Sequence, residues 1–489
     1  MADSVMPAAA VSGGGGDRGR ARSAVTTLAR SITVAAGVFG PGHLGELTRQ
    51  VPFELVDAVL EQTRTTERRL RALPSRVGVY FVLALALFPG VGYGKVWAKL
   101  VAGLDGGPSV SGKALRDLRR RVGAAPLQAL FEVLAGPVAQ PRTPGVRFGR
   151  YRTVSFDGCT SIKVPDTDRN RSWLGKMRAA NGVTGYPAIE LMTLVETGTR
   201  ALLGAVFGPT ATGETDYARR LLPLLNEEML VLADRGFDAA DFLAEVTGTG
   251  AAFLVRLRNN RRLPVLARCE DGSYLSRIGT LTVRIITADI TVTCADDTSY
   301  TANYRLATTL TDPRRHSARA LIGLYHERWE HEIAYLALRH TLGAGRVLRS
   351  TDPAGLRQEM WALLTTYQAL RRAMVSAVES RPGTDPDRAS FATALDTATD
   401  LLVRAEGVTD DTTDLVGEIG RAVLGDLHPP RRPRTSVRKV KSPLSRYNKK
   451  DPYRPERSKP ITDLAITIQA PEPPDATHRP KQLANNPGP

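Results

Sequence analysis

Residues 324–342 read LYHERWEHEIAYLALRHTL and are the most informative segment of the chain. At about 100° per residue, helical spacing places Tyr325, Arg328, Glu332 and Arg339 within a stripe about 60° wide. Such a polar stripe is costly to bury unless it faces a metal ion, a phosphate or partner charges. The alternative is a solvated face on which Arg328 and Glu332 form an ordinary i, i+4 ion pair, and periodicity alone favours that alternative.

Two aspartates that end or interrupt apolar β-like runs argue for a buried site instead. Asp157 stands in YRTVSFDG, residues 151–158, and Asp234 directly follows MLVLA, residues 229–233. Carboxylates at the C-terminal ends of strands in an α/β sheet lie where ligands usually bind. Asp234, which precedes an arginine and a glycine, could instead cap a turn. With Glu332, the two aspartates supply three hard oxygen ligands, which suit Mg²⁺ or Mn²⁺ and not zinc.

Four segments of the chain resemble segments of the insertion element 4 family of DDE transposases, in the same order along the chain. The pattern Y-x2-R-x3-E-x6-R, which begins at Tyr325, matches that family's YREK signature with arginine in place of the final lysine. SFDG around Asp157 and LADRGF around Asp234 are similar to its first and second aspartate motifs, and residues 68–88 are similar to its N-terminal domain. The resemblance covers about residues 40–380.

The resemblance implies an RNase H-like fold and a DNA transposase that cuts element ends and joins them to target DNA by two-metal-ion phosphoryl transfer. Its partners would be double-stranded DNA with terminal inverted repeats, target DNA, and a second copy of the chain in a homodimeric DNA complex. Two Mg²⁺ or Mn²⁺ ions would be held by the three acidic residues, Asp157, Asp234 and Glu332. DNA phosphates would be bound by the other signature positions, Tyr325, Arg328 and Arg339.

Changes in the hydrophobic pattern along the chain, from helical to strand-like spacing, predict an α/β protein of several structural units. Helical patterns give way at a Pro- and Gly-rich linker, residues 136–149, to strands and then to a long helix over 317–342. The expected units are a flexible N-terminal segment 1–39, a helical and DNA-binding domain 40–140, a catalytic domain 150–380 with a β-rich insertion at about 258–312, C-terminal helices 381–427, and a basic, Pro-rich, disordered tail 428–489.

The formal charge of +16 is concentrated near the C-terminus. Residues 427–459 contain twelve Arg or Lys residues and two acidic residues. A positive tail indicates a polyanion partner, because each neutralised phosphate releases counterions. A tail that only keeps the protein soluble would have the same composition.

Cysteine spacing and hydropathy exclude several other classes of protein. The three cysteines, Cys159, Cys269 and Cys294, form no CxxC pair and predict neither a disulfide framework nor a thiolate zinc site. The longest apolar run, residues 77–88, is shorter than the ~20 residues that span a bilayer. We therefore expect a cytoplasmic, nucleoid-associated protein with no membrane partner.

Several other patterns carry little weight. Gly40, Gly42 and Gly45 spell GxGxxG, but Pro41 lies inside it and no βαβ pattern follows. The histidines of residues 324–342 point in different directions, which argues against a histidine metal site. Residues 111–121 form a basic helix that either inserts into a DNA groove or is an ordinary amphipathic helix.

Two questions stay open at the level of sequence. The β-rich insertion offers Tyr274, Tyr300 and Tyr304 as aromatic residues that could stack on a flipped base, as in related transposases, and the sequence does not choose among them. The alternatives to an active transposase are a catalytically silent DNA-binding descendant and a non-mobile RNase H-like nuclease. The three intact carboxylates favour an active enzyme over the first, and the basic N-terminal helices and long insertion favour a transposase over the second.

Overall fold

The structure is a computed structural model that describes residues 42–430 and 461–471, except for short gaps at 68, 70, 72, 104–108, 177, 180–181, 184, 296, 409–413 and 415. The expected flexible segment 1–39, Gly40 and most of the expected basic tail lie outside the described residues. No helix within the described ranges is both long enough and apolar enough to cross a bilayer.

The first part of the described chain is helical, as its apolar periodicity predicts. Proline precedes two of these helices, where its missing N–H and fixed φ suit a helix start, and Ser111 caps another by accepting a hydrogen bond from the Ala114 amide. The helices are α2 Phe53–Gln62, α3 Ser75–Leu87, α4 Tyr93–Val101, α5 Gly112–Val122 and α6 Ala125–Leu134. Helix α3 begins with Ser75 and Arg76, is mainly apolar from Val77 onward, and is buried along almost its whole length.

The central sheet has the strand order of an RNase H-like fold. Its first part runs β6-β5-β2-β7-β8, in which β2, β7 and β8 are parallel, β5 is antiparallel to β2, and β6 is antiparallel to β5 and so runs in the same direction as β2. This arrangement confirms the predicted mixed α/β fold. The strands are β1 Arg147–Phe148, β2 Tyr151–Lys163, β5 Ala188–Glu196, β6 Leu202–Pro209, β7 Met229–Ala233 and β8 Ala252–Arg256. A separate two-stranded sheet pairs β3 Arg178–Ala179 with β4 Gly182–Val183.

The β-rich insertion continues the central sheet. Its strand β12 pairs antiparallel with β8, and the order then runs β12-β11-β10-β9. A strand from the C-terminal tail, β13, pairs with β11, so part of the segment that we expected to be disordered is a strand. The strands are β9 Ala267–Arg268, β10 Tyr274–Ile278, β11 Leu281–Cys294, β12 Ser299–Thr308 and β13 Ile461–Gln469. Alternate apolar residues of β13 pack against the sheet: Leu464, Ile466 and Ile468.

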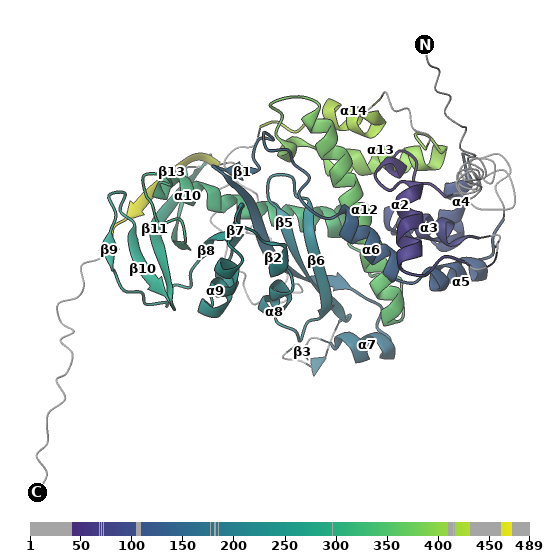
Figure 1. The fold of residues 1–489 in the computed structure, drawn as a ribbon, viewed down its shortest axis with the longest axis horizontal. Helices are drawn as coiled ribbons and strands as arrows, with labels where there is room; N and C mark the ends of the chain where they lie inside the picture. The colour runs from purple at the N-terminus through teal and green to yellow at the C-terminus, as the bar shows by residue number, and fades with distance from the viewer. Residues whose placement is uncertain are drawn as a thin grey trace, which may run out of the picture.

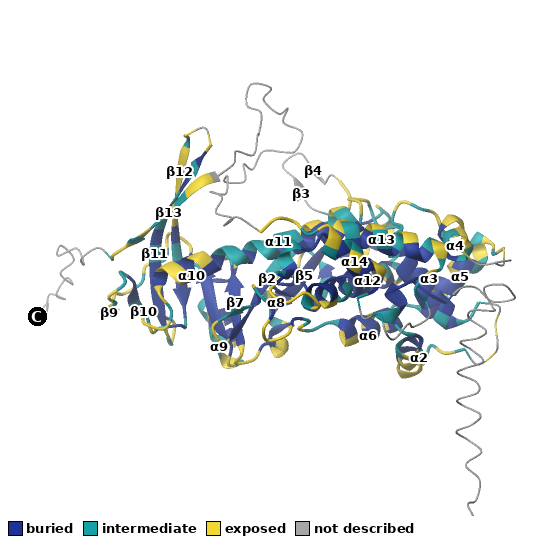
Figure 2. Cartoon of the chain, turned by 90° about the horizontal axis from the view of Figure 1, so that it is seen from above, coloured by how far each residue is buried: buried dark blue, intermediate teal, exposed yellow. Residues whose placement is uncertain are grey.

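Helices cover both faces of the sheet. Helices α8 Glu214–Arg219 and α9 Ala240–Gly248 pack on one face over an apolar cluster that includes Val154, Phe156 and Val231. Figure 2 shows α10 and α11 on the side of the sheet opposite α9. The catalytic candidates Asp157 and Glu332 belong to elements that meet on this second side, between β2 and α11.

The predicted helix over residues 317–342 is not continuous. It consists of α10 Ala318–Tyr325, a 3-10 turn η5 His326–Arg328, α11 Trp329–Leu336 and a π-helical segment η6 Ala337–Leu342. The change from a 3-10 turn to an α-helix and then to a π-helical segment interrupts the regular spacing at both ends of α11. Tyr325 and Glu332 both lie close enough to Arg328 to affect its pKa.

One long helix joins the two ends of the folded chain. The apolar cluster around α12 Pro353–Glu379 contains residues from α2–α6, from β5 and β6, and from the C-terminal helices α13 Phe391–Arg404 and α14 Gly417–Gly425. Figure 1 shows α13 and α14 packed beside the N-terminal helices, at the end of the molecule opposite the insertion. Segments 40–140 and 381–427, which the sequence analysis separated, thus share one hydrophobic core.

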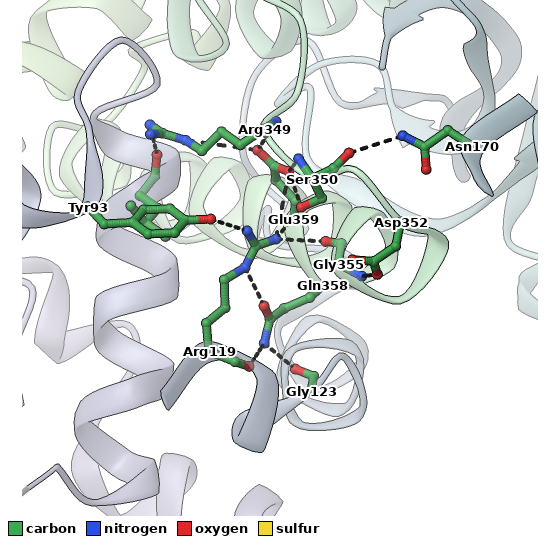
Figure 3. Close-up of polar contacts among 11 residues, drawn as sticks. Tyr93, Arg119, Gly123, Asn170, Arg349, Ser350, Asp352, Gly355, Gln358 and Glu359 are labelled. Atoms are coloured by element: carbon green, nitrogen blue, oxygen red, sulfur yellow. Dashed lines mark hydrogen bonds and ion pairs between the residues drawn. The ribbon is translucent and has the colours of Figure 1, made fainter. Parts of the chain in front are cut away.

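A polar cluster ties α5 to the start of α12 (Figure 3). Arg119 is buried and donates to the Gln358 side chain, the Tyr93 hydroxyl and the Ser350 hydroxyl. The Gln358 amide donates back to the Arg119 and Gly123 carbonyls. Helix α5 therefore uses one of its arginines for domain packing, while Arg116 and Arg120 stay exposed.

Truncation of a residue on α12 tests whether this shared core holds the chain together. Leu364 is fully buried, so Leu364→Ala should lower the free energy of unfolding by ~2–5 kcal/mol through lost burial and a cavity. Val133→Ala, at a side chain that is 55% exposed, is the control and should change it by less than ~0.5 kcal/mol. Urea unfolding followed by tryptophan fluorescence measures both. Equal effects of the two substitutions would contradict the shared core.

Candidate active site

Parallel pairing of β2 with β7 places the two aspartates side by side. The register pairs Ser155 with Leu232, and each aspartate comes two residues later on its own strand. Neighbouring strands lie about 4.8 Å apart, so both carboxylates leave the same edge of the paired region. Asp234 follows the end of β7, whereas Asp157 lies inside the longer β2 at the point where β7 stops.

Asp157 forms a largely buried ion pair with Arg328 of η5. Arg328 Nη1 lies 3.3 Å from Asp157 Oδ2, and the two side chains are 9% and 16% exposed. Asp157 Oδ1 accepts a hydrogen bond from the Gly158 amide at 3.0 Å. Arg328, the last residue of the 3-10 turn, thus contacts Asp157 directly.

Electrostatics place all three predicted carboxylates in one cluster. The pKa of Asp157 is raised to about 7, because burial and the negative charges of Glu332 and Asp234 together outweigh the opposing effect of Arg328. Burial lowers the pKa of Arg328, but nearby charges that include these three carboxylates outweigh burial and leave its pKa raised. The structure therefore brings Asp157, Asp234, Glu332 and Arg328 together.

Asp234 also serves as a cap, as the alternative interpretation proposed. Its Oδ1 accepts a hydrogen bond from the Gly236 amide at 2.7 Å at the start of η4 Arg235–Phe237. A carboxylate has about four lone-pair positions, and this bond uses one of them. The capping and ligand roles are thus compatible, and the cap fixes the orientation of the side chain.

A buried network that the sequence analysis missed connects α11 to the strand that carries Asp157. His331 Nδ1 lies 2.8 Å from Ser155 Oγ, and His331 Nε2 lies 2.7 Å from Thr193 Oγ1. The Tyr335 hydroxyl donates to the Asp157 carbonyl oxygen at 2.6 Å. Burial lowers the pKa of His331 to about 3, so the ring is neutral. His331 and Tyr335 are four residues apart on one helix, but nothing in the sequence marks their partners.

Tyr325 lies beside Arg328, whereas Arg339 lies further along the helical segment. Tyr325 is 5% exposed and packs edge-on against Tyr304, with ring centroids 6.2 Å apart. Burial raises its pKa to about 12. Arg339, on the π-helical segment, lines a cavity next to Lys163, at the far end of β2 from the start of β7.

The structure separates the three tyrosines of the insertion. Tyr274 and Tyr304 are buried, at 6% and 7% exposed, whereas Tyr300 on β12 is 46% exposed. The Arg256 guanidinium covers the Tyr304 ring at 4.2 Å from its centroid. Tyr300 is therefore the one of the three with a ring face accessible to a base.

Two further carboxylates lie behind Asp157, near Gly158 of the SFDG motif. A Cβ at Gly158 would lie 2.7 Å from Glu214 Oε1 and 3.0 Å from Glu190 Oε1. This close approach accounts for glycine at the position. Glu190 is buried, and burial followed by the charges of Glu214 and Asp157 raises its pKa to about 7. No sequence motif indicated either glutamate, because β5 and α8 lie outside the motif segments and only the tertiary fold brings them next to Gly158.

The acidic residues fit a divalent cation by their chemistry but do not yet enclose one. Among the described residues, no group of three or more His, Cys, Asp or Glu side chains is arranged to hold a metal ion. Arg328 instead supplies the positive charge beside Asp157. The cluster nevertheless consists of hard oxygen donors whose mutual repulsion raises a pKa, and a bound cation would relieve that repulsion.

Comparisons with known proteins agree with the sequence motifs. Residues 41–132 match the insertion element 4 transposase N-terminal family, and residues 149–368 match the transposase DDE domain family. The chain is 24% identical over 425 residues to the transposase InsG for insertion sequence element IS4 of Escherichia coli K12, covering 83% of this chain and 93% of that protein. It is 28% identical over 138 residues to the putative transposase InsZ of the same strain, covering 28% of this chain and 46% of that protein.

A solved structure also shows a distant likeness. The cryo-EM structure of a piggyBac transposase synaptic complex with hairpin DNA aligns with 82% of this chain and 88% of its own, at a TM-score of 0.36 and 11% identity.

The raised pKa of Asp157 predicts a specific dependence of stability on pH. Between the ordinary pKa of 3.8 and about 7, the folded metal-free protein retains a proton that the unfolded chain releases, so stability falls as the pH rises through this window. Asp157→Asn cannot titrate there. Its free energy of unfolding relative to the wild type should therefore increase from about pH 4 to about pH 7 and then level off.

Urea unfolding at fixed ionic strength with EDTA measures this difference. Glu228→Asn is the control, since the Glu228 side chain is 70% exposed, and its difference from the wild type should not rise through the upper half of the window. A flat profile for Asp157→Asn between about pH 5 and pH 7 would contradict the assigned burial of this carboxyl group.

Proposed function

Because the chain belongs to the insertion element 4 family of DDE transposases, we propose that it cuts the ends of its insertion sequence and joins them to target DNA. The observation that carries this proposal is the cluster of Asp157, Asp234 and Glu332 around Arg328. The three carboxylates would form the catalytic metal site. The DNA substrates would be duplexes with terminal inverted repeats together with target DNA.

The metal is proposed to be Mg²⁺, or Mn²⁺, bound as two ions. Dependence on divalent metal is general for DDE transposase domains. When bound, two such ions activate the attacking water or DNA 3′-hydroxyl and stabilise the leaving oxygen of an in-line displacement. Asp157 must be ionised to bind them, so metal binding should weaken below about pH 7.

The residues around the acids orient them and balance their charge. Arg328 stays protonated at any accessible pH, so it remains a cation beside the reacting phosphate once Asp157 binds metal. The neutral His331 and the Tyr335 hydroxyl hold β2, β5 and α11 in register, which fixes the Asp157 backbone. The Tyr325 ring is buried against Tyr304, so only its hydroxyl group would contact a phosphate.

Other surfaces are proposed to bind DNA outside the metal site. The exposed Tyr300 is the best candidate to stack on an unpaired base, because stacking needs an accessible ring face. The exposed arginines of α5 can contact phosphates. We further propose that two copies of the chain assemble on DNA ends and that the protein is associated with the nucleoid.

Neutral replacements of the acids test the catalytic assignment. Asp157→Asn, Asp234→Asn and Glu332→Gln should each reduce Mg²⁺-dependent cleavage of end-containing DNA by at least ~10³-fold, because each removes a metal ligand, while end binding stays within about threefold of the wild type. Gel assays of cleavage and of binding in Ca²⁺ measure the two quantities. Glu228→Gln is the control.

Each variant reports on its own residue. Cleavage at the wild-type rate by one of the three would remove that residue from the site. A wild-type protein that folds and binds DNA but does not cleave it would indicate a catalytically silent descendant. A wild-type protein that cleaves DNA but does not join strands would indicate a nuclease.

Substitutions of Arg339 test the last position of the signature. Arg339→Lys restores the usual family residue and should keep substantial excision, because an ammonium also pairs with phosphate. Arg339→Ala should lower excision by at least about tenfold, and Arg339→Glu should lower it more because its charge repels DNA. Thermal melts should be unchanged in all three. Equal excision by all three variants would mean that Arg339 does not contact DNA.

A further inference from the structure

A cavity of about 120 Å³ lies where the N-terminal helices, the end of β2 and the π-helical segment meet α12. One wall is apolar and comes from Val82 and Leu85 of α3. The other walls combine apolar residues, such as Ile162 and Leu363, with five arginine or lysine residues: Arg119, Lys163, Arg339, Arg346 and Arg349. This volume has room for several water molecules, and hence for a phosphate group with part of its sugar.

Two of the arginines at this cavity, Arg119 and Arg349, share one acidic partner, Glu359. Glu359 accepts hydrogen bonds from the Arg349 and Ser350 backbone amides at 2.8 and 3.1 Å, and it lies 3.7 Å from Arg119 Nη2 and 3.9 Å from Arg349 Nε. Figure 3 shows these groups turned toward one another. Arg349 also donates to backbone carbonyls that follow α3. Arg119 and Arg349 therefore hold the domains together and leave little charge for a ligand.

Three other cations line the same cavity: Lys163, Arg339 and Arg346. In the part of the chain that the structure describes, none of the three has an acidic partner, and Glu359 is occupied by Arg119 and Arg349. Lys163 and Arg346 are exposed, and Arg339 is half-buried. Three like charges around one hollow repel one another, and an anion at their centre offsets that repulsion.

The cavity lies next to the candidate active site but is separate from it. Arg339, on η6, comes seven residues after Glu332, on α11, and these consecutive helical segments separate the two residues by roughly 10 Å along the axis. The strand β2 makes the same connection from the other side, since it carries both Asp157 and Lys163. A DNA strand held at the carboxylates would reach this hollow within a few nucleotides, given an axial rise of about 3.4 Å per nucleotide.

We propose that this cavity binds one backbone phosphate of the DNA end, a few nucleotides from the phosphate that is cut. Lys163 and Arg346 join Arg339 as its ligands, and the wall of α3 contacts the adjoining sugar. This assignment rests on the proposed function and adds two phosphate ligands outside the signature. Because the cavity is built from both domains, the same phosphate fixes the N-terminal helices relative to the cleavage site.

The test removes protein and DNA charges in combination. Single methylphosphonate linkages, which lack the phosphate charge, are placed one at a time on both strands near the cut, and affinity is measured with EDTA. In the wild-type protein, one position should weaken binding by on the order of tenfold. The double variant Lys163→Ala/Arg346→Ala should bind unmodified DNA correspondingly less tightly, with a salt slope lower by ~0.9, and lose sensitivity at that position alone.

Two control variants accompany it. Arg404→Ala removes a cation that is 51% exposed and paired on α13, and should keep the wild-type profile. Lys163→Arg retains the positive charge and should also show the wild-type methylphosphonate profile. The proposal is overturned if every methylphosphonate position that weakens binding of the wild type also weakens binding of the double variant. It is also overturned if the double variant binds all the DNAs less tightly by the same factor, with no loss of sensitivity at one position.

The cavity and the catalytic assignment fail in different ways. Metal-dependent cleavage by the wild type with an unchanged methylphosphonate profile in the double variant removes only the cavity assignment. The expected change in profile without any cleavage by the wild type supports the cavity and removes the catalytic proposal.

Discussion

The buried ion pair between Asp157 and Arg328 is the interaction on which the catalytic region depends. Three carboxylates gathered at the edge of a sheet repel one another, and burial makes their ionisation more costly still. The pKa of Asp157 at about 7 expresses this cost. Arg328 offsets it from within the chain, so the protein can fold around an acidic site before any metal binds. In the proposed function, the same guanidinium would lie next to the reacting DNA phosphate.

The helical segment that carries the signature is irregular. Arg328 ends a 3-10 turn and pairs with Asp157, and Arg339 lies on a π-helical segment and lines a cavity together with Lys163. Irregular helical turns cost backbone hydrogen-bond geometry and are common at functional sites. Here the network of His331 and Tyr335 anchors α11 between the two irregular turns, which compensates part of that cost.

The helical core gives the site its rigidity. Because α12 packs with helices from both ends of the described chain, the catalytic edge of the sheet and the N-terminal domain cannot shift independently without disturbing one apolar cluster. The buried Arg119 and its partners add directional contacts to that non-directional packing. The insertion, in contrast, extends the sheet away from this core and is closed by a strand from the C-terminal segment.

The sequence by itself determined the element types, the order of strands and helices, and the three carboxylates, because apolar periodicity and motif spacing are local properties. Asp157, Asp234 and Glu332 were predicted, as was the helical N-terminal domain. Only the tertiary structure decided which groups meet: that Arg328 pairs with Asp157 while Arg339 lines another cavity, that Tyr300 alone of three tyrosines is accessible, and that β13 adds to the sheet. These outcomes depend on helix irregularity, burial and strand pairing between residues far apart in the chain, which no local pattern encodes.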